Sequence, residues 1–288
     1  MRIAVLSSPD AWHFLDLKRA AGDVHDVISF RFEELAARIE DRRIFDLKAD
    51  CVVVRTMSAG SLQQVVFRMD FLGQLAATGT LVLNSPKSIE AAVDKYLSLA
   101  MLSEAGVSVP RTSVSQTVSV AVKAFEQLGG NVVVKPLFGS MGNGIVRLRS
   151  PDEAKNVFEE LIESGSVVYQ QEYVDHDAFD LRLLVVGDEV LGMKRTNSSN
   201  WITNISQGGV GEPYSPSPEE KQIAVRAARS VGAHFAGVDL IYESNSGRQL
   251  VLEVNAVPGW RAISQVLKLD VAKMFLGEIE KLLISRRR

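Results

Sequence analysis

The sequence predicts an α/β protein with three lobes, and the order of its elements is the reason. Strand-like and helix-like runs alternate over the first 90 residues, a second α/β unit follows, and strand-like runs dominate from residue 167. This order predicts an open parallel sheet first and a mostly antiparallel sheet last. We therefore expect an N-terminal lobe over residues 1–90, a central α+β lobe over 91–166 and a C-terminal lobe over 167–288.

The N-terminal lobe is predicted from four strand-like runs, at residues 2–6, 24–30, 51–55 and 81–84. Helix-like stretches such as 60–78 separate them, which favours a small parallel sheet with helices on both faces. Ser85-Pro86 then predicts a helix start, because proline is favoured in the first turn.

The central lobe is predicted to alternate helices and strands. Its expected elements are a helix at 94–105, a turn at 106–110, a helix near 117–128, strands 132–135 and 145–149 around a glycine-rich loop, and a helix to about 164. The last helix begins at a predicted capping box, Ser150–Glu153.

The C-terminal lobe is predicted to be mostly strands. Its expected strands are 167–171, 181–186, 190–195, 236–242 and 249–255, with a helix from the capping box Ser217–Glu220 to about 232 and a closing helix near 270–285. The polar stretch 196–215 shows little periodicity, so no regular element is expected there.

Composition excludes several classes of protein. The chain has 288 residues and a formal net charge of −3, so no basic balance points to nucleic acid or a membrane surface. Cys51 is the only cysteine, which excludes an internal disulfide and favours the cytoplasm. We expect neither a signal peptide nor a membrane span, and the four histidines lack zinc-ligand spacing.

The most informative candidate site is the hairpin of the last two strands. Glu253 and Asn255 are two residues apart, so their side chains share a face. If Asn245–Gly247 forms a three-residue loop, Asp239 lies opposite Glu253. Two close carboxylates repel unless a cation neutralises them, and oxygen ligands suit Mg²⁺. The alternative is a hairpin with a solvated polar face, although the acids interrupt largely apolar strands.

A lysine followed by a glycine-rich loop forms a second candidate site. Strand 132–135 ends at Lys135, and Gly139, Gly142 and Gly144 follow. Glycines let backbone N–H groups approach phosphate oxygens closely. The loop is neither a P-loop nor a Rossmann turn, because a strand follows it. Taken alone, such a segment is more often a plain hairpin loop.

The third candidate site is the stretch Tyr169–Val174, followed by Asp180-Leu181-Arg182. A strand end with exposed backbone groups could hydrogen-bond an adenine edge, and Glu172 or Asp180 could bind ribose hydroxyls. Without its context, an ordinary strand and turn is the better explanation of this stretch.

Together and in this order, the segments resemble the ATP-grasp superfamily. The matching stretches are Asp94-Lys95, Glu104–Thr112, the Lys135 strand with its loop, Gln171–Tyr173, Asp180–Arg182 and Glu253–Asn255. Within it, the chain is similar to the branch named for the ribosomal-protein S6 glutamate ligase, and most of all to tetrahydromethanopterin:L-glutamate ligases. Phe67–Asp70, Asn200–Gly209 and Glu253–Trp260 carry that similarity.

The resemblance implies a role for each matching residue. Phosphates of ATP would be bound by Lys95, Lys135, Gly139, Ser140, Met141, Gly142 and Gly144. Adenine and ribose would be bound by Gln171, Glu172, Tyr173, Val174 and Asp180. The reacting phosphate and carboxylate would face Arg182, Arg195 and Asn204. Two Mg²⁺ ions, replaceable by Mn²⁺, would be bound by Asp239, Glu253 and Asn255.

The implied activity is an ADP-forming ligation of L-glutamate to an acceptor carboxylate through an acyl phosphate. The first choice of acceptor is a tetrahydromethanopterin-type pterin, and a peptide, protein tail or amino-acid-derived acceptor is the alternative. Ribosomal-protein ligases carry a basic residue just before the position of Asn204, where this chain has Thr203. A small-molecule kinase or a non-catalytic ATP-binding module are the competing classes, and a homodimer or homotetramer is compatible with the resemblance.

The acceptor site is expected between the N-terminal lobe and the catalytic core. Its candidate residues are Arg55, Arg68, Trp260 and Arg261. Arg55 follows strand 51–54, and open α/β sheets bind ligands outside such strand ends. Arginine can bind a carboxylate through two parallel hydrogen bonds, although solvated surface arginines are the alternative. Segments 139–144 and 196–215 are expected to close over the site and exclude water.

Overall fold

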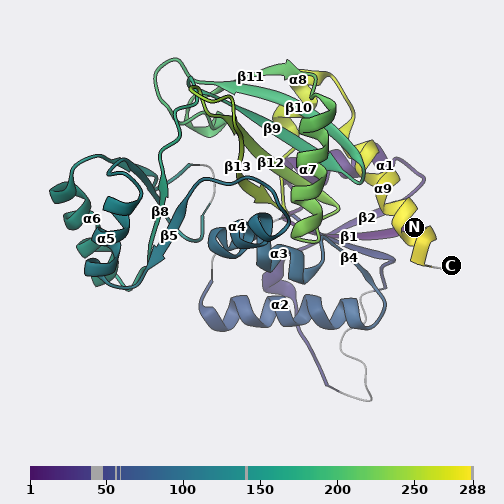
Figure 1. Cartoon of the computed structure of the whole chain (residues 1–288). Coiled ribbons are helices and arrows are strands. Elements are labelled where there is room, and N and C mark those ends of the chain that lie inside the picture. Colours follow the sequence, from purple (N-terminus) through teal and green to yellow (C-terminus); the bar gives the residue numbers. More distant parts are fainter. Residues whose placement is uncertain (40–47, 56, 59, 140–141, 287–288) are drawn as a thin grey trace.

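The computed structural model describes residues 1–39, 48–55, 57–58, 60–139 and 142–286. These residues form three sheets, a parallel one near the N-terminus followed by two antiparallel ones (Figure 1). The predicted α/β fold class is thereby confirmed. None of the described helices is both long and apolar enough to cross a lipid bilayer.

The N-terminal sheet has the strand order β2-β1-β3-β4. Its elements are β1 (Arg2–Leu6), α1 (Trp12–Ala21), β2 (Asp26–Phe30), the 3-10 helix η1 (Phe32–Glu34), β3 (Cys51–Val54), α2 (Leu62–Ala77) and β4 (Leu81–Leu83). Both faces are covered, α1 on one side and α2 on the other, which explains why β1 and β3 are almost entirely apolar. After β1 the chain continues to β2 on one side, and after β3 it continues to β4 on the other side. Because these connections run in opposite directions, the carboxyl ends of β1 and β3 flank a crevice.

The central sheet has the order β5-β8-β6-β7 and packs on two helices. Its elements are β5 (Thr112–Ser115), α5 (Val118–Gln127), β6 (Val132–Lys135), β7 (Val146–Leu148), α6 (Pro151–Glu163) and β8 (Val168–Glu172). The sequence does not predict β5, whose residues are mostly polar. Strand β8 pairs with β5 and β6, although the expected boundary at residue 166 assigned it to the C-terminal lobe.

The C-terminal sheet has the order β11-β10-β9-β12-β13. Its strands are β9 (Phe179–Val186), β10 (Glu189–Thr196), β11 (Val210–Tyr214), β12 (Phe235–Tyr242) and β13 (Gln249–Asn255). One face packs on α3 (Pro86–Val93), α4 (Lys95–Glu104) and α7 (Pro218–Ser230), the other on α8 (Arg261–Leu267) and α9 (Val271–Arg286). The 3-10 helix η2 (Ile205–Gln207) precedes β11.

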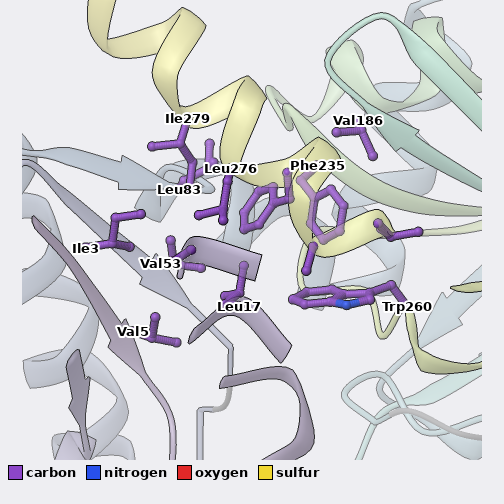
Figure 2. Close-up of a cluster of buried hydrophobic side chains, with 14 of the residues drawn as sticks. Ile3, Val5, Leu17, Val53, Leu83, Val186, Phe235, Trp260, Leu276 and Ile279 are labelled. Atoms are coloured by element: carbon purple, nitrogen blue, oxygen red, sulfur yellow. The ribbon is translucent and has the colours of Figure 1, made fainter. Parts of the chain in front are cut away.

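One hydrophobic core joins the N-terminal sheet to the C-terminal sheet and α9 (Figure 2). The indole of Trp260 is fully buried, with its ring centroid 5.6 Å from that of Phe235 and 6.0 Å from that of Phe275. Ile3 and Val53 of the parallel sheet belong to the same cluster. The N-terminal lobe therefore shares the main core of the molecule and is not an appended domain.

Asn84, at the end of β4, adds a polar link between the same two sheets. Its Nδ2 donates to the carbonyl oxygens of Phe235 and Ala256, each at 2.6 Å. Its Oδ1 accepts from the backbone N–H groups of His234 (2.9 Å) and Phe235 (3.2 Å). One buried amide thus binds the start of β12 and the loop after β13.

Candidate active site

A cavity of about 900 Å³ is lined by residues of the central and C-terminal sheets and by His13 of α1 in the N-terminal lobe. Residues in its wall from the predicted set are Lys95, Lys135, Gly139, Gly142, Asp180, Arg182, Arg195, Asn204, Asp239, Glu253, Asn255 and Arg261. Residues that lie far apart in the sequence therefore meet at one site. Ser140 and Met141, also predicted to bind phosphate, lie outside the described residues.

Asp239 of β12 lies opposite Glu253 of β13, as the sequence predicts, but the hairpin reaches that register differently. Near the turn, Leu240 pairs with Val251, and a β-bulge shifts the register by one residue before Asp239 pairs with Glu253. The bulge places one extra residue, Leu252, on β13. The three oxygen-bearing side chains, Asp239, Glu253 and Asn255, all line the cavity.

Two arginines hold the acids on the C-terminal sheet. Arg182 Nη1 lies 2.6 Å from Asp239 Oδ1, and Arg195 Nη2 lies 3.0 Å from Asp239 Oδ2. Arg195 also donates to both oxygens of Asp180, at 2.7 and 2.5 Å. Burial alone would lower the pKa of Arg195, but the Asp239 and Asp180 carboxylates outweigh it and raise the pKa. Arg195 thus remains cationic despite its burial.

Two lysines face these groups from the other side of the cavity. Lys135 Nζ donates to Gln171 Oε1 at 2.8 Å, and Lys95 Nζ donates to the carbonyl of Gly139 at 2.8 Å. Burial lowers the pKa of Lys135 to about 8, although the nearby Glu253 carboxylate opposes the shift. Burial also lowers the pKa of Lys95. Neither lysine forms an ion pair within the described residues, so both can bind an incoming anion.

The two segments expected to close over the site contact each other. Gln207 Nε2 donates to Asn143 Oδ1 at 3.1 Å. Gly142 has φ of +75°, and a Cβ atom there would lie 3.1 Å from Asn204 Oδ1 and 3.3 Å from Ile202 Cγ2. Gly144 lies against Pro136. The glycine-rich loop and the 202–207 segment therefore form one wall of the cavity.

The predicted adenine segment is not in the cavity wall within the described residues. The Gln171 amide binds Lys135, and the N–H groups of Glu172 and Tyr173 donate to the carbonyls of Arg111 and Asn131, each at 2.9 Å. The Val174 carbonyl contacts His176 Nδ1 at 2.9 Å. Asp180 lines the cavity, but both its oxygens accept from Arg195, so its predicted ribose contact would compete with that ion pair.

Two of the four expected acceptor contacts need correction. Trp260 has no exposed surface, and its indole N–H donates to Asp16 Oδ2 at 2.8 Å, so it supports the wall from behind. Arg68 is also buried. It donates to the Ser58 carbonyl at 2.6 Å and lies 3.7 Å from the Glu33 carboxylate, inside the N-terminal lobe.

Of the other two expected contacts, one lies in the cavity wall and the other is buried outside it. Arg261 is in the cavity wall. Arg55 lies just behind it, donating from Nη2 to the Pro258 carbonyl at 2.7 Å.

Among the residues of the cavity wall that sequence reasoning missed are two histidines, His13 and His176. Both histidines were weighed only as zinc ligands. A usable signal for His13 was its position, because it lies in the first turn of a helix that follows a parallel strand, where ligands often bind.

The donor set suits a hard cation. Among the described residues, no three or more His, Cys, Asp or Glu side chains are grouped so that they could hold a metal ion, which leaves two carboxylates and one amide at this hairpin. Mg²⁺ typically takes one or two protein carboxylates and completes its shell with water and phosphate oxygens. As ligand types, Asp239, Glu253 and Asn255 therefore fit Mg²⁺ better than zinc. Both oxygens of Asp239 are bound by arginines, so a metal contact of this carboxylate would compete with those ion pairs.

Comparison with known proteins gives consistent matches. A family model described as a RimK-like ATP-grasp domain matches residues 92–279. The tetrahydromethanopterin:alpha-L-glutamate ligase of Methanococcus maripaludis is 32% identical over 295 residues, which cover 96% of this chain and 97% of that protein. The ribosomal protein bS6–L-glutamate ligase of Escherichia coli is 32% identical over 214 residues, 73% of this chain and 71% of that protein.

A solved structure has the same fold over nearly the whole chain. The ATP-grasp ligase PsnB, complexed with a minimal precursor, Mg and ADP, matches with a TM-score of 0.75 at 21% identity, covering 99% of this chain and 97% of that chain. At that identity the likeness concerns the fold.

Proposed function

The chain belongs to the RimK-like ATP-grasp family and is an ADP-forming carbon–nitrogen ligase, and we propose that it joins L-glutamate to the carboxylate of a tetrahydromethanopterin-type pterin. Glutamate is the amino acid named for the relatives reported above, both the pterin ligase and the ribosomal-protein ligase.

The extent of the pterin-ligase match carries the choice of acceptor. That match covers 96% of the chain, against 73% for the ribosomal-protein ligase, so it includes the N-terminal lobe. This lobe contributes His13 to the cavity wall, beyond the phosphate-binding candidates. The buried Thr203, where ribosomal-protein ligases carry a basic residue, also argues against a protein tail.

In the first proposed step, the acceptor carboxylate attacks the γ-phosphorus of ATP, giving an acyl phosphate and ADP. Lys95 and Lys135 would bind the phosphates from the side of the central lobe, and Arg182 and Arg195 would offset the charge on the transferred group. Asp239, Glu253 and Asn255 would hold Mg²⁺, which supplies further charge neutralisation when bound.

In the second proposed step, the amine of L-glutamate attacks the acyl carbon and phosphate leaves. The step needs no protein nucleophile. Burial raises the pKa of Cys51, the only cysteine, so its thiol stays protonated and is a poor nucleophile. The acyl phosphate must be kept from water. The contact between Gln207 and Asn143 supports a wall that excludes it.

Mass spectrometry of reaction products tests the proposal directly. The chain would be incubated with ATP, Mg²⁺, L-glutamate and either tetrahydromethanopterin or a panel of glutamate-ended peptides. We expect a mass gain of one glutamyl unit on the pterin, with ADP formed over many turnovers only when glutamate is present. A glutamylated peptide and an unchanged pterin would replace our acceptor by a peptide. ADP release that does not depend on any amine would indicate a kinase.

A further inference from the structure

One end of the cavity lies near the carboxyl ends of the strands in the N-terminal sheet, the place where open α/β sheets usually bind ligands. His13, Gly259 and Arg261 line this end, which continues from Asn255 of the predicted metal site through Val257. Arg55 follows β3 and Ser7 follows β1, so both lie at the carboxyl ends of the two strands that flank the crevice. The function of this end is not explained by ATP binding.

Arg55 is a buried cation with no acidic partner among the described residues. Its side chain is buried, its Nη2 donates to the Pro258 carbonyl, and its guanidinium lies 4.5 Å from the Trp260 ring centroid. Burial lowers the pKa of Arg55 to about 9, and no carboxylate offsets it. Its Nε and the hydroxyl of the neighbouring Ser7 are buried without hydrogen-bond partners in the described part of the chain. An uncompensated buried charge is costly unless an anion approaches it.

His13 is held as a neutral hydrogen-bond donor. The backbone N–H of Trp260 donates to His13 Nε2 at 3.2 Å, so the ring proton must lie on Nδ1. Burial, with Arg55 and Arg261 nearby, lowers the pKa of His13 to about 3, which keeps the ring neutral at ordinary pH. Its Nδ1–H has no acceptor among the described residues. It lies in the first turn of α1, where backbone N–H groups also favour an anion.

Arg261 supplies an accessible cation beside His13. Its guanidinium carbon lies 5.6 Å from the ring centroid of Trp12, a contact that orients it, and no ion pair is formed with it in the described residues. The nearest acid on α1 is already engaged. Asp16 accepts from the Trp260 indole at 2.8 Å and from Arg19 Nε at 2.9 Å.

We propose that Arg261 and the Nδ1–H of His13 form a carboxylate-binding subsite, with Arg55 as a buried positive charge behind it, and that the carboxylate is one of L-glutamate's. The assignment to L-glutamate rests on the proposed function. A glutamate held here by one carboxylate would lie in the same cavity as the metal hairpin, where its amine is needed. The carboxylate of the pterin acceptor is the other source of the same chemistry, and the experiment separates the two.

Calorimetric titration of the full chain, with ADP and Mg²⁺ present, tests the subsite without turnover. The titrants are L-glutamate and, separately, tetrahydromethanopterin. The variants are Arg261→Gln and His13→Asn, which keeps an acceptor for the Trp260 N–H, and the control is Arg226→Gln, an exposed arginine on α7. We expect Arg261→Gln to weaken glutamate binding by about tenfold to a hundredfold, His13→Asn by less, and the control to change nothing.

Each outcome has a defined meaning. Weaker pterin binding with unchanged glutamate binding would overturn the assignment to glutamate and give the subsite to the acceptor. Unchanged binding of both titrants in both variants, or no binding of either by the wild type, would overturn the subsite itself. If Arg261→Gln abolishes glutamate binding while the wild type glutamylates no pterin, the subsite stands and the proposed acceptor fails.

Discussion

Glu253 differs from the other acids of the site in its surroundings. Asp180 and Asp239 are both held by arginines, whereas no hydrogen bond or ion pair to Glu253 is found among the described residues. It does influence the pKa of both Lys95 and Lys135, so its carboxylate lies near them. A carboxylate in that position is available to a divalent cation.

We therefore expect Glu253→Gln to abolish turnover while leaving the fold intact. The loss in kcat should exceed about a hundredfold, because an amide is a poorer Mg²⁺ ligand than a carboxylate. Steady-state ADP release at several Mg²⁺ concentrations measures it, and the thermal midpoint should stay within a few degrees. Glu243→Gln, at the other end of the same hairpin, is the control. Full activity of Glu253→Gln at ordinary Mg²⁺ would contradict its role.

Lys135 should give the enzyme an alkaline limit. Its pKa is lowered to about 8 by burial, so the cation that would bind phosphate is progressively lost as the pH rises through 8. We expect kcat/KM for ATP, which reports the free enzyme, to fall about tenfold for each pH unit above that value. Lys135→Arg keeps its charge, so its profile should stay flat to higher pH, whatever its absolute rate. A wild-type profile that is flat from pH 7 to 10 would exclude this role.

Side chains on strands were easier to predict than side chains that depend on tertiary packing. Alternation along a strand sufficed to place Glu253 and Asn255 on one face, and the assumed loop length predicted that Glu253 pairs with Asp239. The position of Trp260 was not predictable in this way. Next to Gly259 in a loop, it has no periodicity that separates a cavity residue from a core residue.

At the level of elements, the β12–β13 hairpin shows a local prediction that is right for an incomplete reason. A three-residue loop would set the pairing of Asp239 with Glu253 along the whole hairpin. The structure has another register near the turn, and the bulge at Leu252 restores the expected pair. Bulges leave no clear mark in a single apolar strand sequence, so only the pair itself was predictable.

The short strands β5 and β11 were not predicted, because they are strands through pairing with their neighbours and not through their own residue pattern. Strand β11 contains Gly211 and Pro213, which normally argue against a strand, but β11 is at a sheet edge, where proline is tolerated.

Of the two capping boxes predicted at helix starts, one was right and one was wrong. Ser217 accepts from Glu220 N at 3.2 Å as predicted, whereas Ser150 makes no side-chain cap, so the capping box expected there is wrong.

The glycine-rich loop supports a prediction about ATP binding. We expect Gly142→Val to raise KM for ATP and slow turnover at least tenfold, because a side chain there would push against Asn204 and Ile202 and strain a left-handed residue. Gly165→Val is the matched control: its φ is +77°, but a Cβ atom there meets nothing within 4 Å. Both variants should lose similar stability in thermal unfolding. Equal ATP kinetics in the two variants would show that the loop is only a structural turn.

At the scale of the whole molecule, Asn84 is placed to hold the lobes in register. We expect Asn84→Ala to lower the free energy of unfolding by about 2–4 kcal/mol, because it leaves the buried backbone groups of Phe235, His234 and Ala256 without partners. Urea denaturation measures this loss. Asn156→Ala, at an exposed position of α6, should change the same quantity by less than about 0.5 kcal/mol. A comparable small change in both variants would mean that the lobes do not depend on this amide.

The shared core around Trp260 has a consequence for building hybrid ligases. A designer who wants another acceptor would exchange residues 1–90 for those of a relative, since this segment reads as a separate module in the sequence. The donor's first sheet would then meet an α9 and a Trp260 loop shaped for different neighbours. Mismatched volumes in such a core cost stability through cavities or overpacking. The exchangeable unit is therefore discontinuous, and a graft should carry both ends of the donor chain, the N-terminal sheet together with the segment from Trp260 through α9.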